Sequence, residues 1–132
     1  MIRQFFLKTR RIGFSKWLSK DIELAKLLWG NPQVTRYICA TGKFSTNDII
    51  KRLKTEIQNE SLYRVQYWPI FTITENSFIG CCGLRPRIND EFEIGFHLRP
   101  EFWGKGFAEE AAKATIHYAF TVVNASKLFA GH

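Results

Sequence analysis

The spacing of apolar residues along the first half of the chain predicts one strand and two helices. Between Phe5 and Phe14 apolar side chains alternate with polar ones, which is typical of a strand. Ser19 is a suitable cap for a helix that runs to Leu28, and the sequence "GNP" that follows is expected to stop it. A second helix is expected to begin at Ser45 or Thr46. Its apolar stripe consists of Ile49, Ile50, Leu53 and Ile57.

The second half of the chain is richer in strands. "VQYWPIFTITENSFIGCCGL" predicts two strands joined by a turn at Asn76 and Ser77, and "EFEIGFHLRP" predicts another strand after a turn at Asn89 and Asp90. A helix is expected over residues 106–124, and "KLFAG" then predicts one more short strand. The apolar stripe of that helix is predicted from Ala108, Ala111, Ala112, Ile116, Ala119, Phe120 and Val123.

The resulting order, β-α-α-β-β-β-α-β, predicts an α/β (α+β) fold with a mixed sheet flanked by helices. No repeat, low-complexity tract or linker divides the 132 residues, so we expect a single domain over residues 1–132.

Composition limits the range of functions. Nineteen basic residues against twelve acidic ones give a net charge of +7, which favours anionic partners without selecting among them. The three cysteines have neither a disulfide framework nor zinc-ligand spacing, so no metal is expected and a cytoplasmic location is predicted. No apolar stretch reaches the length of a membrane span, and we expect no membrane partner.

The segment "EFWGKGFAEEAAKATIHYAF" places glycines at 104 and 106 directly before an alanine-rich helix that lacks a polar cap. The first turn of a helix leaves backbone N–H groups without partners, and glycine allows an anion to approach them closely. Lys105 would add a cation at the rim. The segment therefore predicts a phosphate site, and a plain tight turn before a surface helix is the alternative.

The run "FEIGFHLRPEFWGKGFAEEA" resembles the GNAT superfamily of N-acetyltransferases, in particular the branch that contains the ribosomal-protein N-terminal acetyltransferases. The family signature, [R/Q]-x-x-G-x-[G/A], aligns with residues 103–108, where Trp103 replaces the Arg or Gln. "FLKTRRIGF", "SKDIELAKLLWGNPQVTRYI" and "FIGCCGL" resemble other parts of that branch, so the resemblance covers nearly the whole chain.

The resemblance implies that acetyl-CoA is the co-substrate and that an amine accepts its acetyl group. The pyrophosphate would lie on the backbone of the motif, at Trp103, Gly104, Lys105, Gly106, Phe107 and Ala108. The main chain of Phe96, His97 and Leu98, on the preceding strand, would pair with the pantetheine and stabilise the oxyanion.

An amine must lose a proton before it attacks a thioester, so a general base is expected. Glu93 lies where several family members carry a general-base glutamate, and His97 is a weaker alternative. Strand alternation predicts that Glu91, Glu93, Gly95 and His97 share one face. A solvated strand residue is the alternative interpretation of Glu93.

Family members usually continue beyond the point where this sequence ends, with a further helix and two strands. We therefore expect a C-terminally shortened domain with an open sheet edge at its last strand, through which a homodimer could form. Two other classes of function stay open. One is a non-catalytic acyl-CoA-binding module. The other is a basic RNA- or ribosome-binding protein with Lys51, Arg52 and Lys54 as contacts. Of the partners considered, nucleic acid is the less favoured one.

Overall fold

The strands form one sheet, with helices on both of its faces. The computed structural model describes residues 3–36, 38–39 and 41–130. Within these residues the sheet has the order β1-β2-β3-β4-β5-β6, and all neighbouring strands are antiparallel except the parallel pair β5 and β6. The strands are β1 (Leu7–Lys8), β2 (Ile12–Phe14), β3 (Tyr67–Thr72), β4 (Phe78–Pro86), β5 (Glu91–Leu98) and β6 (Lys127–Ala130).

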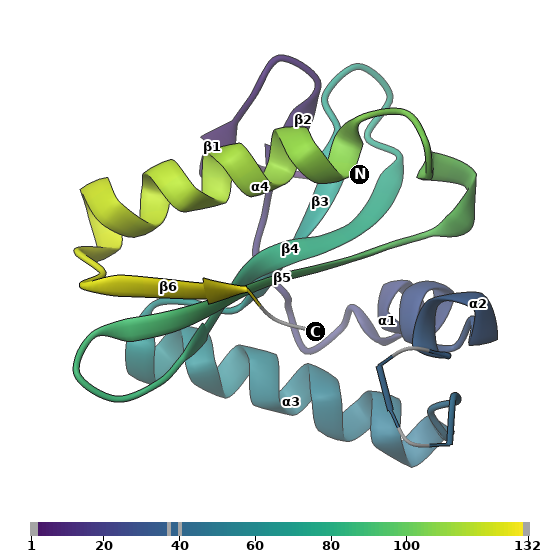
Figure 1. Cartoon of the computed structure of the whole chain (residues 1–132). Coiled ribbons are helices and arrows are strands. Elements are labelled where there is room, and N and C mark those ends of the chain that lie inside the picture. Colours follow the sequence, from purple (N-terminus) through teal and green to yellow (C-terminus); the bar gives the residue numbers. More distant parts are fainter. Residues whose placement is uncertain (1–2, 37, 40, 131–132) are drawn as a thin grey trace.

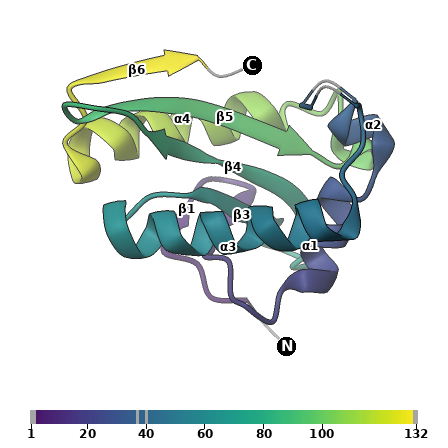
Figure 2. The ribbon, with the colours of Figure 1, turned by 90° about the horizontal axis from the view of Figure 1, so that it is seen from below.

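The helices lie in two layers, one on each side of the sheet (Figures 1 and 2). Helix α4 and its continuation η2 cover one face, and α1, α2 and α3 cover the other. Their bounds are α1 (Ile22–Trp29), α2 (Pro32–Thr35), α3 (Thr46–Tyr63), the 3-10 helix η1 (Pro100–Phe102), α4 (Phe107–Tyr118) and the π-helix η2 (Ala119–Val123). The predicted α/β class, with a mixed sheet flanked by helices, is confirmed.

Large side chains pack on both faces of the sheet, so the sheet has two hydrophobic cores. Trp68 and Phe14 are buried on the α4 side, while Trp29 is buried on the side of α1 and α3. Cys81 and Cys82 are both fully buried, and because they are adjacent on β4 they enter opposite cores.

The segment predicted as one strand at residues 5–14 is a hairpin instead. β1 pairs antiparallel with β2, and the chain reverses between them. The hydroxyl and backbone N–H of Thr9 close the turn, with Thr9 N–H donating to the Ile12 carbonyl at 2.8 Å and Ile12 N–H donating to Thr9 Oγ1 at 3.0 Å. The turn contains no glycine or proline, so the sequence lacks the usual signals of a chain reversal there.

The two predicted helix starts have different outcomes. Ser45 caps α3 as expected, in a reciprocal capping box with Asp48. The first helix begins at Ile22 rather than directly after Ser19, and its N-cap residue is Asp21. The Asp21 carboxylate makes no capping bond and instead forms an ion pair with Arg3. "GNP" ends α1 and also starts α2, where the Asn31 side chain accepts from Gln33 N–H.

The helix predicted over residues 106–124 is α4 followed by η2, with a different buried stripe. Phe107, Ala111, Thr115 and Ala119 are buried, whereas Ile116 and Phe120 are exposed. Thr115 fits among apolar neighbours because its hydroxyl donates to the Ala111 carbonyl. The last predicted strand is β6; Gly131, which the prediction included, lies outside the described residues.

The turn before β5 is the one predicted, since Asn89 and Asp90 both adopt left-handed backbone conformations, with φ of 57° and 58°. Among the described residues, no helix combines the length and the apolar character needed to cross a bilayer.

Candidate active site

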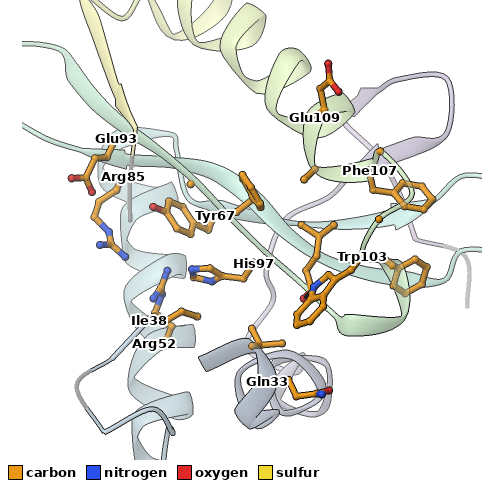
Figure 3. Close-up of a pocket in the computed structure, with 18 of the residues that line it drawn as sticks. Gln33, Ile38, Arg52, Tyr67, Arg85, Glu93, His97, Trp103, Phe107 and Glu109 are labelled. Atoms are coloured by element: carbon orange, nitrogen blue, oxygen red, sulfur yellow. Dashed lines mark hydrogen bonds between the residues drawn. The ribbon is translucent and has the colours of Figure 1, made fainter. Parts of the chain in front are cut away.

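A cavity of about 740 Å³ opens between the C-terminal half of β5, the turn before α4, and helices α2 and α3. On one side of it lie Glu93, Arg85, Arg52, Tyr67 and His97, called here the polar side, and Trp103 and Phe107 lie on the other side with Glu109 (Figure 3). All the predicted site residues except Lys105 line this cavity, namely Glu93, Phe96, His97, Leu98, Trp103, Gly104, Gly106, Phe107 and Ala108.

The backbone between η1 and α4 forms one end of the cavity. Gly104 and Gly106 adopt left-handed conformations, with φ of 72° and 81°. Nothing lies within 4 Å of the position that a Cβ on Gly104 would occupy. Helix α4 has no side-chain cap, and within the described residues no protein acceptor is hydrogen-bonded to the amides of residues 104–109. The turn therefore presents unpartnered N–H groups at the positive end of a helix dipole, which suits an anion.

Arg11, in the turn between β1 and β2, holds this end of the cavity in place. Its Nη1 donates to the Lys105 carbonyl at 3.0 Å, its Nε donates to Glu110 Oε1 at 2.7 Å, and its guanidinium lies 4.1 Å from the centroid of the Phe107 ring. The Lys105 backbone is thus fixed from outside, while its side chain does not line the cavity. Sequence reasoning missed Arg11 because the partners are 94 and 99 residues away in the chain.

Glu110 completes this link between the hairpin and α4. It also accepts from the Thr9 hydroxyl and from the Arg11 backbone N–H. Partial burial raises the pKa of Glu110, but the hydrogen bonds from Thr9 and Arg11 outweigh it, and the pKa lies below its ordinary value. Glu110 is therefore ionised near neutral pH and has a structural role, in which it holds the hairpin against α4. Its neighbour Glu109 forms an ion pair with Lys113.

The outer edge of β5 is only partly covered. β6 pairs with residues 91–94 of β5, so in the described structure the remaining residues of β5 have β4 as their only strand neighbour. This edge is available to an extended ligand. One acceptor at its end is already used, because the Trp103 indole N–H donates to the Leu98 carbonyl at 2.8 Å.

His97 lies on the wall of the cavity in a neutral form. The Trp29 indole N–H donates to His97 Nδ1 at 3.1 Å, so this nitrogen is the acceptor and Nε2 carries the proton. Burial lowers the pKa of His97 to about 3, with further contributions from the charges of Arg52 and Arg85.

Glu93 lies on the same face of β5 as His97 and lines the cavity at its polar side. Its carboxylate is 30% exposed and lies 3.6 Å from Arg87 Nη1. A weak pair of this kind leaves most of the carboxylate free to accept a proton or a hydrogen bond.

Three more side chains form the polar side of the cavity and were not predicted as site residues. Tyr67 comes from β3, Arg52 from α3 and Arg85 from β4 (Figure 3). The RNA-binding alternative took Arg52, with Lys51 and Lys54, as an RNA contact; the structure corrects this, since the Arg52 side chain is only 12% exposed and forms an ion pair with buried Glu56. Nothing in the α3 sequence pattern distinguishes an inward arginine from an outward one.

The cysteines are not suited to nucleophilic chemistry. Burial raises the pKa of Cys81, and it raises that of Cys82 to about 12, so both are neutral thiols. Among the described residues, no group of three His, Cys, Asp or Glu side chains is arranged to hold a metal ion.

Comparison with known proteins identifies relatives along almost the whole chain. Residues 11–132 match the Acetyltransferase (GNAT) domain. The uncharacterized N-acetyltransferase p20 of Bacillus licheniformis is 31% identical over 125 residues, which is 92% of this chain and 70% of the relative.

Solved structures share the fold. An acetyltransferase of the GNAT family from Bacillus anthracis is 26% identical, with a TM-score of 0.80, covering 96% of this chain and 72% of that one. RimL, a ribosomal L7/L12 alpha-N-protein acetyltransferase in complex with coenzyme A, has a TM-score of 0.70 at 18% identity, covering 87% of this chain and 67% of that one.

Proposed function

Because the chain belongs to the GNAT family of acetyl-CoA-dependent N-acetyltransferases, we propose that it moves an acetyl group directly from acetyl-CoA to a primary amine. The observation that carries this proposal is the set of unpartnered amides at residues 104–109, beside the uncovered edge of β5. One cavity contains both features and also a carboxylate that can act as a base.

The residues at the turn fit the cofactor. A diphosphate needs several N–H donors at close range and no Cβ in its way, and Gly104 and Gly106 provide both conditions. The backbone of Phe96 and His97 is the part of β5 that would pair with the pantetheine arm. Leu98 is less available than the sequence suggested, because Trp103 already occupies its carbonyl.

The chemistry requires one proton acceptor. When bound, acetyl-CoA would supply a thioester whose carbonyl carbon forms a C–N bond with the amine as its C–S bond breaks, and the departing thiolate would take up the second proton that the nitrogen loses. Glu93 would take the proton that the ammonium group loses. His97 is poorly suited to this role, because its acceptor nitrogen is engaged by Trp29 and its pKa lies far below that of an amine. Backbone N–H groups of β5 would stabilise the oxyanion.

For the acceptor we propose a small amine or a protein N-terminus, as in the branch that contains the ribosomal-protein acetyltransferases. The fold shared with RimL is consistent with this branch.

Two measurements test the proposal. Calorimetric titration with acetyl-CoA should show saturable binding, and release of free thiol from acetyl-CoA should depend on an added amine. Binding without turnover on a broad amine panel would favour the non-catalytic acyl-CoA module, and absence of binding would contradict the proposal as a whole.

A further inference from the structure

The polar side of the cavity contains a guanidinium with one nitrogen that has no hydrogen-bond partner among the described residues. Arg52 donates from Nε to Glu56 Oε2 at 2.7 Å, yet its Nη2 is buried with no hydrogen-bond partner in the described structure. A buried donor of a charged group that stays unpaired is costly, so native proteins normally satisfy it. Arg52 lines the cavity, but its Nη2 has no solvent access, so a ligand in the cavity would supply the missing acceptor only after the guanidinium rotates.

A second guanidinium, that of Arg85, lies beside the same aromatic ring as the first. The Cζ atoms of Arg52 and Arg85 are each 5.2 Å from the centroid of the Tyr67 ring. Arg85 forms no ion pair with any described residue. Two like charges beside one ring repel each other unless an anion lies between them.

The acidic residues of the cavity do not balance this charge. Only two carboxylates line it among the described residues, and both have cationic partners elsewhere, Glu93 with Arg87 and Glu109 with Lys113. Glu56 compensates Arg52 alone. One positive charge therefore remains uncompensated, and it contributes to the lowered pKa of His97.

This inference rests on the proposed function. We infer that the acceptor amine also carries a carboxylate. Arg52 and Arg85 bind this carboxylate, while Glu93 accepts the proton of the amine. Guanidinium groups bind carboxylates through paired N–H donors, and such charge-assisted bonds are among the stronger ones in proteins.

The sheet register restricts the distance between the two groups of the acceptor. Arg85 and Glu93 face each other across β4 and β5, so their Cβ atoms are about 5 Å apart. No ion pair joins them, and in Figure 3 their side chains point apart, with Arg85 directed toward Arg52. Because the two side chains leave paired positions of the sheet, one acceptor that carries both a carboxylate and an amine can meet Arg85 and Glu93 together. A free α-amino acid and a peptide with an N-terminal acidic residue both meet this condition.

The test compares paired amines of which one carries the carboxylate and the other an amide in its place, at a pH above the pKa of both amines. Amino acids are assayed against their amides, and Asp-Ala-Ala-amide is assayed against Asn-Ala-Ala-amide, by thiol release from acetyl-CoA. We expect the carboxylate member of one pair to be the better substrate, and the pair that responds identifies the source of the carboxylate. Equal activity within both pairs would overturn the inference while leaving the proposed function intact.

Variants assign the preference to the arginines. Arg85→Gln should lower kcat/KM for the carboxylate member about tenfold to a hundredfold and leave the neutral member within about twofold. Arg52→Lys, which keeps a charge beside Glu56, should give a smaller loss of the same kind. Lys20→Gln removes an equal charge at an exposed residue outside the cavity and should change neither member. Equal losses for both members in Arg85→Gln would contradict the assignment.

A binding measurement does not depend on turnover. N-acetyl amino acids and their amides are titrated into the protein in the presence of coenzyme A. The carboxylate form should bind more tightly to the unmodified protein, and Arg85→Gln should abolish that difference while leaving acetyl-CoA affinity unchanged. Equal binding of both forms to the unmodified protein would overturn the inference, whereas absence of acetyl-CoA binding would instead overturn the proposed function.

Discussion

The two ends of the cavity are built from different parts of the polypeptide. At the α4 end, the groups that suit a ligand are backbone amides in one continuous stretch, residues 104–109. At the other end they are side chains from three elements, with Arg52 on α3, Arg85 on β4 and Glu93 on β5. A main-chain site tolerates changes of side chain as long as its glycines remain, whereas a side-chain site changes its ligand with a single substitution. In this protein the first end suits a constant cofactor and the second a variable acceptor.

The largest expected effect separates chemistry from binding. Glu93→Gln should lower kcat about a hundredfold to ten-thousandfold, because the amide cannot accept the proton of the ammonium group. Stopped-flow or steady-state thiol release measures the rate, and acetyl-CoA affinity should be unchanged. Glu91→Gln is the matched control, since Glu91 lies on the same face of β5 and does not line the cavity. If kcat is retained in Glu93→Gln, another group or a water molecule is the base.

The next largest effect is expected from a substitution that changes only the α4 end of the cavity. Gly106→Glu should weaken acetyl-CoA binding at least about a hundredfold, since Gly106 has a φ of 81° and an acidic side chain would repel a diphosphate. Calorimetry measures the affinity. Gly42→Glu introduces the same residue at a similar φ, 74°, at a glycine that does not line the cavity, and should leave affinity unchanged. Unchanged affinity in Gly106→Glu would contradict the assignment of the cofactor to this turn.

The smallest expected effect concerns the support of that turn. Arg11→Ala removes the donors to Lys105 and Glu110, and we expect acetyl-CoA affinity to fall about tenfold, with a loss of about 1–2 kcal/mol in the free energy of unfolding. KM for the acceptor should change little, whereas a general loss of folded protein would lower the apparent kcat and leave both KM values unchanged. Arg10→Ala, at the exposed neighbouring residue, is the control. An equal rise in both KM values would show that Arg11 does not act on the turn specifically.

The sequence predicted the α4 end of the cavity better than the other end, for a physical reason. Local signals, such as the glycine turn, the uncapped helix and the capping box at Ser45, depend on neighbours in the chain and can be recognised without the fold. The pairings of Arg11 with Glu110 and of Arg52 with Tyr67 depend on which elements the sheet brings together. The hairpin at residues 7–14 escaped prediction because Thr9, rather than a glycine or proline, closes it.

The link between Arg11 and Glu110 spans 99 residues of chain, and this separation has a consequence for biosynthesis. A nascent polypeptide that has not yet emerged past residue 110 lacks the partner that fixes the turn, however complete its other strands are. Affinity for acetyl-CoA would therefore arise only after residue 110 has emerged, in a step that also anchors the β1–β2 hairpin at the edge of the sheet. By thermodynamic reciprocity, a diphosphate held at the turn would in return protect that edge against local unfolding and proteases.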